Sequence, residues 1–296
     1  MKKTYLFIVI ISIIVNYLNC ISFGISIPDE AGQYKSFESV PEILEEWKAY
    51  ENSEEEVLVK KQSSVFTNSK NNNEIKVTWG KFSKPVYAIG AFLELRKKEK
   101  NNILSLNLAR ARWSFFTKAG TEAAFWQGKI TVFAQSKNKL ERDEWQSFLE
   151  ALSSELPEGT PRPMPFTLLL REESNIKEVY FAFDLSAPNT KGLTEFFYAP
   201  WKSTKGEVVF GFRIFDNDEI FAVNYFNSLV TESQLHSAGI LTEWDFSGKS
   251  FPVIIREGET KEYFCIQGIT IYFIAGNIDE KTAREEMNKI FESWIF

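Results

Sequence analysis

A cluster of prolines near the middle of the chain constrains the fold more than any other feature. Four prolines fall within nine residues: Pro157, Pro161, Pro163 and Pro165. Because proline lacks the backbone N–H that helices and central strands need, this segment must be extended. We interpret residues 157–165 as a connector between an N-terminal lobe at 39–156 and a C-terminal lobe at 166–296. A proline-rich recognition motif is the alternative, although a semi-rigid linker is the commoner use.

The first residues predict export. Lys2 and Lys3 precede an apolar run from Tyr5 to Val15, which is the pattern of a secretory signal peptide. The run is too short to span a bilayer, since a spanning helix takes about 18 apolar residues. We therefore assign residues 1–19 to a signal peptide and residues 20–38 to a tether, and we expect the protein in a bacterial cell envelope.

Cys20 occupies the place of the acylated cysteine in a bacterial lipoprotein signal. The ending Leu18-Asn19-Cys20 resembles a lipobox, although Tyr17 stands where that pattern has leucine and the residue before the cysteine is not small. We expect a lipid anchor at Cys20 that holds the protein to the membrane. The alternative is cleavage after Gly24 or Ser26, which would release a periplasmic or secreted protein.

Composition excludes several functions. The chain has 34 lysines and arginines and 40 aspartates and glutamates, which gives a net charge of −6. It has no continuous run of basic residues that could bind the phosphate backbone of a nucleic acid, so we expect no nucleic-acid partner. His236 is the single histidine, no two glycines have G-x-G spacing, and there is no P-loop. We therefore expect no cofactor, no metal site and no histidine-based catalytic site.

Hydrophobic periodicity predicts strands and helices in both lobes. Strands are expected at Val57–Phe66, Ile75–Phe82, Leu104–Phe116, Glu122–Gln135, Val179–Leu185, Val208–Phe215, Phe251–Arg256 and Tyr263–Ala275. Helices are expected at Val40–Tyr50, Val86–Arg96, Asp143–Leu156, Ile220–Leu229 and Asp279–Trp294. For Val86–Arg96 and Ile220–Leu229 a strand is the alternative. The basic end of the second helix, residues 96–100, is expected to be solvated; contact with an anionic lipid surface is the alternative.

A weak internal repeat suggests how these elements combine. Gln127–Ala134 is echoed by Gln267–Ala275, and in both places the strand leads through an Asn-containing turn to a charged amphipathic helix. Val208–Phe215 and the helix after it are a possible third copy. Chance similarity is the alternative. The pattern predicts an α+β fold of antiparallel sheets with strand-turn-helix units packed on them, with two similar lobes as a possible arrangement.

Aromatic residues make up 15% of the chain and supply the candidate ligand-binding site. The densest cluster lies between Lys191-Gly192 and Lys202-Ser203, so we interpret it as a loop; its candidate ligand-binding residues are Phe196, Phe197, Tyr198 and Trp201. Aromatic side chains in a loop can line an apolar pocket or stack on a sugar or lipid. The alternative is that they cover the end of a sheet core.

Carboxylates and a cysteine provide the remaining candidates. Glu122, Asp184 and Glu195 lie beside aromatics and could serve as acid and base in glycoside hydrolysis. Residues 216–219 form an acidic cluster that lacks the EF-hand pattern, so we expect a helix N-terminus there rather than a calcium site. Cys265 lies in an apolar strand and is expected to be a buried small hydrophobe.

Several short motifs together resemble an uncharacterised family of secreted bacterial proteins, a domain-of-unknown-function family. They are Phe125-Trp126-Gln127-Gly128-Lys129 in a strand, a charged helix ending at Leu152–Pro157, and Pro-x-Pro before the next strand. The resemblance covers about Val86 to the C-terminus, while the apolar Ile220–Phe226 departs from the alanine-rich helix of that family. It implies a non-enzymatic envelope protein and carries over no catalytic residue.

The sequence therefore predicts an exported, lipid-anchored envelope protein that binds an unknown ligand or an envelope partner. No catalytic residue is assigned. A secreted carboxylate-dependent hydrolase is the alternative, and a structural interaction module is the third hypothesis.

Overall fold

The computed structural model describes most of the chain beyond the predicted signal peptide. The described residues are 29–39, 44–53, 56–99, 102–111, 113–157, 159, 163, 165–166, 179–182, 195–203, 205–215, 218–235, 239–246, 248–258 and 260–292. Cys20, Asp184, His236 and most of the connector predicted at 157–165 lie outside them.

The first half of the structure is built on an eight-stranded antiparallel sheet with the strand order β1-β2-β3-β4-β8-β7-β6-β5. Its strands are β1 (Glu30–Ala31), β2 (Tyr34–Ser39), β3 (Leu58–Asn68), β4 (Glu74–Phe82), β5 (Ile103–Ser105), β6 (Trp113–Thr117), β7 (Glu122–Gln127) and β8 (Ile130–Ser136). Its described helices are the short η1 (Glu45–Trp47) and α2 (Lys48–Glu51), and the longer α3 (Pro85–Lys98) and α4 (Arg142–Glu155).

The second half contains a seven-stranded antiparallel sheet with the order β12-β13-β14-β15-β11-β10-β9. Its strands are β9 (Tyr180–Ala182), β10 (Phe196–Ser203), β11 (Gly206–Ile214), β12 (Gly239–Phe246), β13 (Lys249–Glu257), β14 (Lys261–Gln267) and β15 (Thr270–Gly276). Its described helices are α6 (Glu219–Leu235) and α7 (Glu280–Glu292). The fold is α+β, as the sequence predicts.

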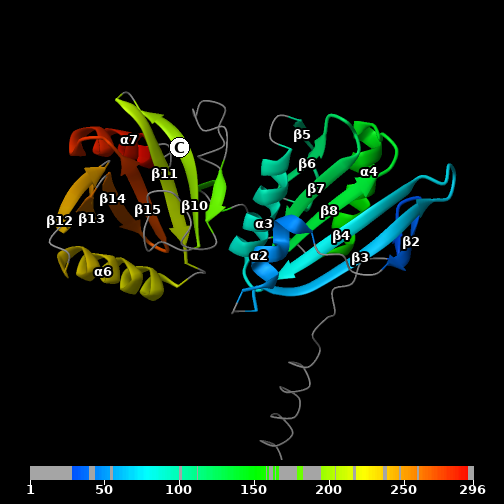
Figure 1. Ribbon diagram of the computed structural model, residues 1–296, viewed down its shortest axis with the longest axis horizontal. Coiled ribbons are helices and arrows are strands. Elements are labelled where there is room, and N and C mark those ends of the chain that lie inside the picture. Colours follow the sequence, from blue (N-terminus) through cyan, green and yellow to red (C-terminus); the bar gives the residue numbers. More distant parts are fainter. Residues whose placement is uncertain are drawn as a thin grey trace, which may run out of the picture.

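The two halves have the same connectivity (Figure 1). Apart from β1, η1 and α2, which the first half has in addition, the described elements follow the same order: β2-β3-β4-α3-β5-β6-β7-β8-α4 and β9-β10-β11-α6-β12-β13-β14-β15-α7. The strand orders also correspond, because β8 returns beside β4 as β15 returns beside β11. The predicted similarity of the two lobes is thus a property of the whole topology.

The sequence repeat marks the same hairpin in each half. Gln127 pairs with Ile130 in the β7–β8 hairpin, and Gln267 pairs with Thr270 in the β14–β15 hairpin. Gly128 and Gly268 begin these two-residue turns with φ of 60° and 55°, a conformation that side chains other than glycine's rarely allow. The possible third copy is not a third example of this hairpin, because β11 followed by α6 corresponds to β4 followed by α3.

Several predicted elements need correction. The described part of the predicted tether, from Asp29 onward, is not free, because β1 and β2 extend the first sheet beside β3. The expected strand Leu104–Phe116 is two short strands, β5 and β6, with irregular chain between them. Strand β12 was not predicted; it is an edge strand whose Ile240 and Leu241 remain exposed.

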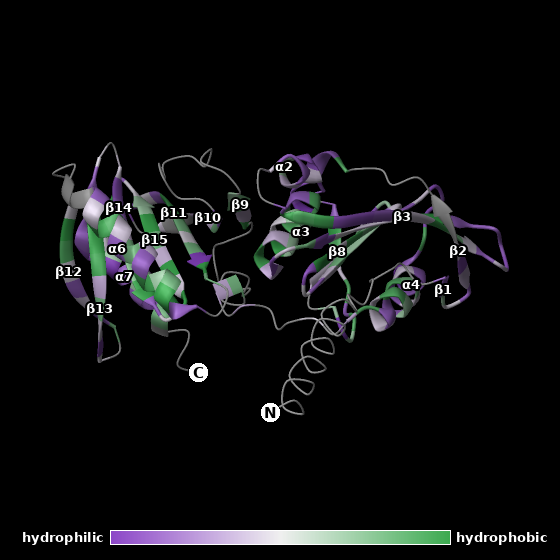
Figure 2. Ribbon diagram, turned by 90° about the horizontal axis from the view of Figure 1, so that it is seen from below, coloured by the Kyte–Doolittle hydropathy of each residue, from purple (hydrophilic) through white to green (hydrophobic). Residues whose placement is uncertain are grey.

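Alternate residues of the sheets enter different cores, since successive side chains of a strand point to opposite faces. In β7, Ala123 and Phe125 pack toward α4, while Ala124 and Trp126 join the core that contains α3. The second sheet has α6 on one face and α7 on the other. Figure 2 shows hydrophobic residues along inner strands such as β11 and β15 and hydrophilic residues along much of β3.

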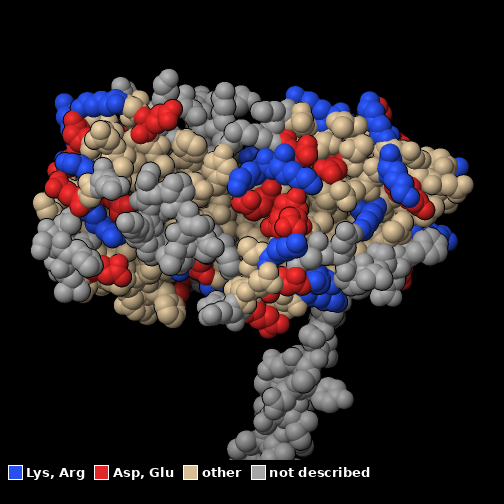
Figure 3. All heavy atoms as spheres, viewed as in Figure 1, with Lys and Arg blue, Asp and Glu red and all other residues tan. Residues whose placement is uncertain are grey.

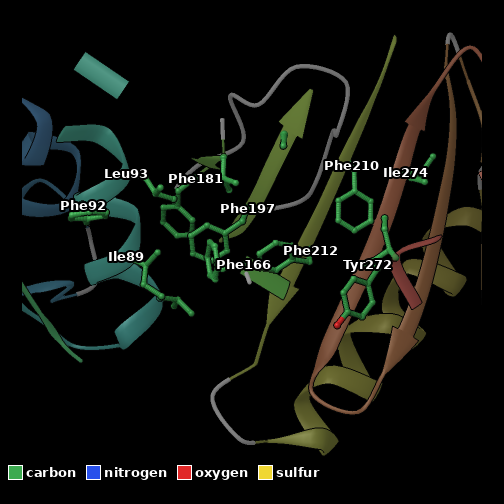
Figure 4. Packing of buried hydrophobic residues seen from close by; sticks show 14 of the residues in the cluster. Ile89, Phe92, Leu93, Phe166, Phe181, Phe197, Phe210, Phe212, Tyr272 and Ile274 are labelled. Atoms are coloured by element: carbon green, nitrogen blue, oxygen red, sulfur yellow. The ribbon is translucent and has the colours of Figure 1, made fainter. Parts of the chain in front are cut away.

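Helix α3 joins the two halves into one continuous core. Its residues from Val86 to Leu93 are all buried, which is expected of a helix that is apolar all round. One side packs on the first sheet, and the other side meets the second half. Figure 4 shows Ile89 and Leu93 of this helix lying toward Phe181 and Phe197.

The buried thiol of Cys265 provides a first prediction. Burial raises the pKa of this thiol to about 12, so it stays protonated at neutral pH. In a chain carrying Cys20→Ser, where Cys265 is the only cysteine, a disulfide reagent at pH 8 should react about 100-fold more slowly with the folded than with the unfolded protein.

The same thiol gives the direction of a pH effect on stability. A raised pKa in the folded state means that its contribution to stability is complete below about pH 8.5, the pKa of an unperturbed thiol, and is lost as the pH rises toward the folded value. Urea unfolding of the Cys20→Ser chain from pH 8 to pH 11, compared with a chain that also carries Cys265→Ala, isolates this contribution. Equal labelling rates for folded and unfolded chain would contradict the buried position.

Candidate functional site

The predicted aromatic loop is strand β10, so the loop assignment was wrong. Phe196 and Phe197 are both buried: Phe196 packs on Phe273 in one core, with ring centroids 5.2 Å apart, and Phe197 packs on Phe181 in the other, at 4.6 Å. Their alternation places the two rings on opposite, covered faces of the sheet. Tyr198 is half-buried with its ring beside Tyr180, and the side chain of Trp201 lies outside the described part of the structure.

Strand β10 contains a proline, Pro200. Pro200 pairs with Val209 of β11, but the pairing of β10 with β9 ends at Tyr198. The described β9 does not extend as far as Pro200. Proline's lack of a backbone N–H therefore breaks no hydrogen bond between β10 and β9. Phe196 and Phe197 enter different cores, as neighbouring residues of a strand do. This alternation is visible only in the tertiary structure.

A pocket of about 500 Å³ lies next to this strand, where the two halves meet. Lys84 and Val86 come from the start of α3, Glu195 precedes β10, and the remaining lining comes from the end of β11 and the first turns of α6. These last residues are Arg213, Ile214, Phe215, Asp218, Phe221, Asn224 and Tyr225. The size falls in the range of pockets that hold small organic ligands.

Glu195 links the two halves across this pocket. Its carboxylate accepts a hydrogen bond from the Tyr87 hydroxyl and pairs with Arg213, whose Nη2 lies 2.9 Å from Oε2. Lys84 lies farther off, with Nζ 3.7 Å from Oε1. Tyr87 and Lys84 belong to the first half, and Arg213 belongs to the second. The carboxylate is therefore held between cations from both.

The backbone of Glu195 is unusual for a residue other than glycine. Its φ of 59° lies in the left-handed region, a conformation that costs roughly 1 kcal/mol or more for a side chain of this kind. Such a residue persists only where its surroundings hold it. Here the ion pair with Arg213 and the hydrogen bond from Tyr87 supply that restraint.

Aromatic rings surround the other side of Arg213. The guanidinium carbon lies 4.8 Å from the centre of the Phe215 ring and 4.4 Å from that of Tyr225, within range of cation–π attraction. Burial raises the pKa of Tyr225, although the charge of Arg213 and a hydrogen bond with it favour the phenolate. The pocket thus presents a fixed guanidinium and a phenol that is neutral at physiological pH.

The acidic cluster at 216–219 contributes a helix cap. The Asp218 carboxylate accepts a hydrogen bond of 3.1 Å from the backbone N–H of Phe221 and so caps the start of α6, as the sequence predicts. Residues 216 and 217 lie outside the described residues. Among described side chains, no group of three or more histidines, cysteines and carboxylates is arranged to hold a metal ion.

The three candidate carboxylates are not brought together. Glu122 accepts a hydrogen bond of 3.0 Å from Gln135 on the neighbouring strand of the first sheet, and Asp184 lies outside the described residues. Only Glu195 lines the pocket, where the partners described above are cations and a phenol. Elsewhere, burial raises the pKa of Glu262 despite the nearby Arg256, but neither residue lines this pocket.

The basic end of α3 meets acidic and aromatic neighbours. Lys98 pairs with Glu46 at 3.4 Å, and Lys97 pairs with Glu94 at 3.5 Å. Figure 3 shows basic and acidic side chains close together near the middle of this face. No helix in the described ranges is both long and apolar enough to span a membrane.

Sequence reasoning missed Lys84, Arg213 and Tyr225 as site residues. Lys84 lies between β4 and α3, Arg213 is the penultimate residue of β11, and Tyr225 is in the second turn of α6, so all three lie near the equivalent strand-to-helix connections of the two units. Recognising β4–α3 and β11–α6 as equivalent would have singled out these two junctions. Nothing local in the sequence shows that they face one another.

No protein-family model, curated protein or solved structure matches this chain.

Proposed function

We propose that this chain is an exported, lipid-anchored envelope protein that binds a small ligand in the pocket between its two halves. The pocket itself is the observation that carries the proposal. It combines a volume of about 500 Å³ with an arginine held between two aromatic rings and a partly exposed lysine. Apolar walls with a few fixed polar groups are the usual composition of a small-molecule site.

A binding role agrees with the chemistry of the pocket better than hydrolysis does. A carboxylate-dependent hydrolase needs two carboxyl groups facing one bond of the substrate, one as acid and one as base or nucleophile. In this pocket Glu195 forms ion pairs, and Asp218 caps a helix. Both carboxylates therefore have structural roles, which supports ligand binding. The membrane is the proposed partner through Cys20, and the proposed location is the bacterial envelope.

Mass spectrometry of the chain purified from its own envelope tests the proposal. The denatured spectrum should give a chain that begins at Cys20 and carries the added mass of acyl groups, because lipoprotein processing cleaves before the cysteine and acylates it. Cys20→Ser should abolish both the added mass and the membrane retention. An unmodified wild-type chain beginning near Ile25 would contradict the anchor.

The native spectrum of the same sample tests ligand binding. An excess mass that disappears on denaturation is the expected result, since a noncovalent ligand does not survive unfolding. The native spectrum is recorded for the Cys20→Ser chain as well, so that loss of the anchor and loss of the ligand are measured separately. A native mass equal to the denatured mass would contradict a stably bound ligand.

A further inference from the structure

We propose that the ligand of this pocket is an amphiphile with one anionic head group and an apolar chain. This inference rests on the proposed function, because it specifies what the pocket binds. The head group would lie at Lys84 and Arg213, and the apolar chain would lie along the start of α6. Long-chain carboxylates are the simplest members of this class.

The head-group end of the pocket offers hydrogen-bond donors with room for an anion. Lys84 is separated from Glu195 by 3.7 Å, beyond the usual N···O distance of a hydrogen bond, and its side chain is 40% exposed. Its ammonium group can therefore turn toward a ligand without leaving a tight ion pair. An ammonium presents three donors, and donors of this kind form strong bonds with carboxylate or phosphate oxygens.

Arg213 adds a second and more rigid cation. Its side chain is only 16% exposed, and its contacts with the Phe215 and Tyr225 rings fix the plane of the guanidinium. A planar guanidinium can bind one carboxylate through one nitrogen and another through a different edge. The anionic head would then share Arg213 with Glu195, while the other carboxylate of the lining, Asp218, is engaged at the start of α6. With two carboxylates already on the lining, a head group with a single negative charge fits better than one with two.

Part of the wall beyond the cations is apolar and reaches the protein surface, beside the polar Asp218 and Asn224. Phe215 and Phe221 line the pocket, and Phe221 is 65% exposed. Ile220 and Val223 on the same turns of α6 are also exposed. A ligand chain that leaves the head-group end beside Phe221 would remove this side chain from water, which a small inorganic anion would not do.

The comparison with α3 shows what is unusual about this helix. Both helices follow equivalent strands, β4 and β11, and are rich in apolar residues, but the outer side of α3 is covered by the second half of the protein. On α6 the first turns leave large apolar side chains exposed beside a pocket that carries cations. A helix surface with this combination suits the apolar chain of an anionic ligand.

Titration calorimetry with defined probes tests the ligand class. The protein is the mature chain 20–296 with Cys20→Ser, which removes its own acyl groups as competitors. The probes are dodecanoate, dodecanol, dodecyltrimethylammonium and acetate, with the two ionic amphiphiles below their micelle concentrations and dodecanol below its solubility limit. Dodecanoate should bind about tenfold more tightly than dodecanol, because the charged head gains bonds to two cations. Acetate should bind at least about 100-fold more weakly, because it lacks the chain.

Two variants locate the binding. Lys84→Gln should weaken dodecanoate about tenfold and leave dodecanol nearly unchanged, whereas Phe221→Ser should weaken both about three- to tenfold. Both side chains are partly exposed, so the fold should survive. Lys97→Gln, at the far end of α3, and Ile240→Ser, on an exposed edge strand, are the matched controls and should change neither affinity.

Each result separates the ligand class from the proposed function. Equal binding of dodecanoate, dodecanol and dodecyltrimethylammonium, or unchanged binding in both pocket variants, would overturn the anionic amphiphile. If dodecanoate fails while a native excess mass is present on the envelope-purified chain, the ligand class is wrong and the binding function stands. Tight binding of acetate alone would identify a small-anion site and overturn the role of the apolar wall.

Discussion

Phe197→Ala should lower the free energy of unfolding by about 3–5 kcal/mol, the cost of removing a large buried aromatic side chain. The Phe197 side chain is fully buried, with ring-centroid distances of 4.4 Å to Phe166, 4.6 Å to Phe181 and 5.4 Å to Phe212. The cavity would open where α3 of the first half meets the second sheet, so both halves should lose stability together. Urea unfolding followed by tryptophan fluorescence measures the change.

The matched control for this prediction is an exposed apolar residue of the same half. Ile240→Ala on the edge strand β12 should change stability by no more than about 0.5 kcal/mol. Phe197 was also a candidate ligand residue, and the two roles predict different results. If Phe197→Ala leaves stability unchanged but weakens ligand binding, the placement of this ring in the core is wrong.

Gly90→Ala should destabilise the protein, although alanine in a helix is normally preferred to glycine by about 1 kcal/mol. A Cβ atom at Gly90 of α3 would lie 2.3 Å from Cδ1 of Phe181 and 2.7 Å from the hydroxyl oxygen of Tyr50. Phe181 is itself packed against Phe197, so it has little freedom to move. Overpacking of this kind costs about 1–3 kcal/mol, which reverses the sign expected from helix propensity.

A double-mutant cycle shows whether the contact with Phe181 is responsible. Phe181→Leu removes part of the ring, so Gly90→Ala in that background should cost less than in the wild type, and the difference measures the clash. Gly258→Ala is the control, since its nearest atom to an added Cβ lies at 3.5 Å and no strain is expected. A stabilising Gly90→Ala would mean that the two halves are not packed closely along α3.

Local sequence patterns predicted most of the regular structure. The α4 helix, expected at Asp143–Leu156, spans Arg142–Glu155 and begins with a capping box between Glu141 and Glu144. The glycine that begins the β7–β8 turn was equally informative, because a left-handed φ is required there. These features depend on residues close in sequence, and the echo of one hairpin by the other suggested the two similar lobes.

The candidate site was harder to predict because it depends on contacts between distant residues. Lys84 and Arg213 are separated by about one whole repeated unit, and Lys84 approaches Glu195 only because α3 packs against the second sheet. The aromatic cluster, by contrast, was interpreted as a binding site because of its composition, but Phe196 and Phe197 are buried in the core. Aromatic side chains serve both purposes, and only the covering of both sheet faces decides between them.

The most direct test of the central claim compares native mass spectra of two chains purified from the bacterial envelope. One is the wild type, and the other carries Lys84→Gln together with Phe221→Ser, both at the pocket between the halves. The account predicts an excess mass on the wild type that is lost on denaturation and is reduced or missing on the folded double variant. The same excess mass on both chains would place the ligand elsewhere and contradict the pocket as the binding site.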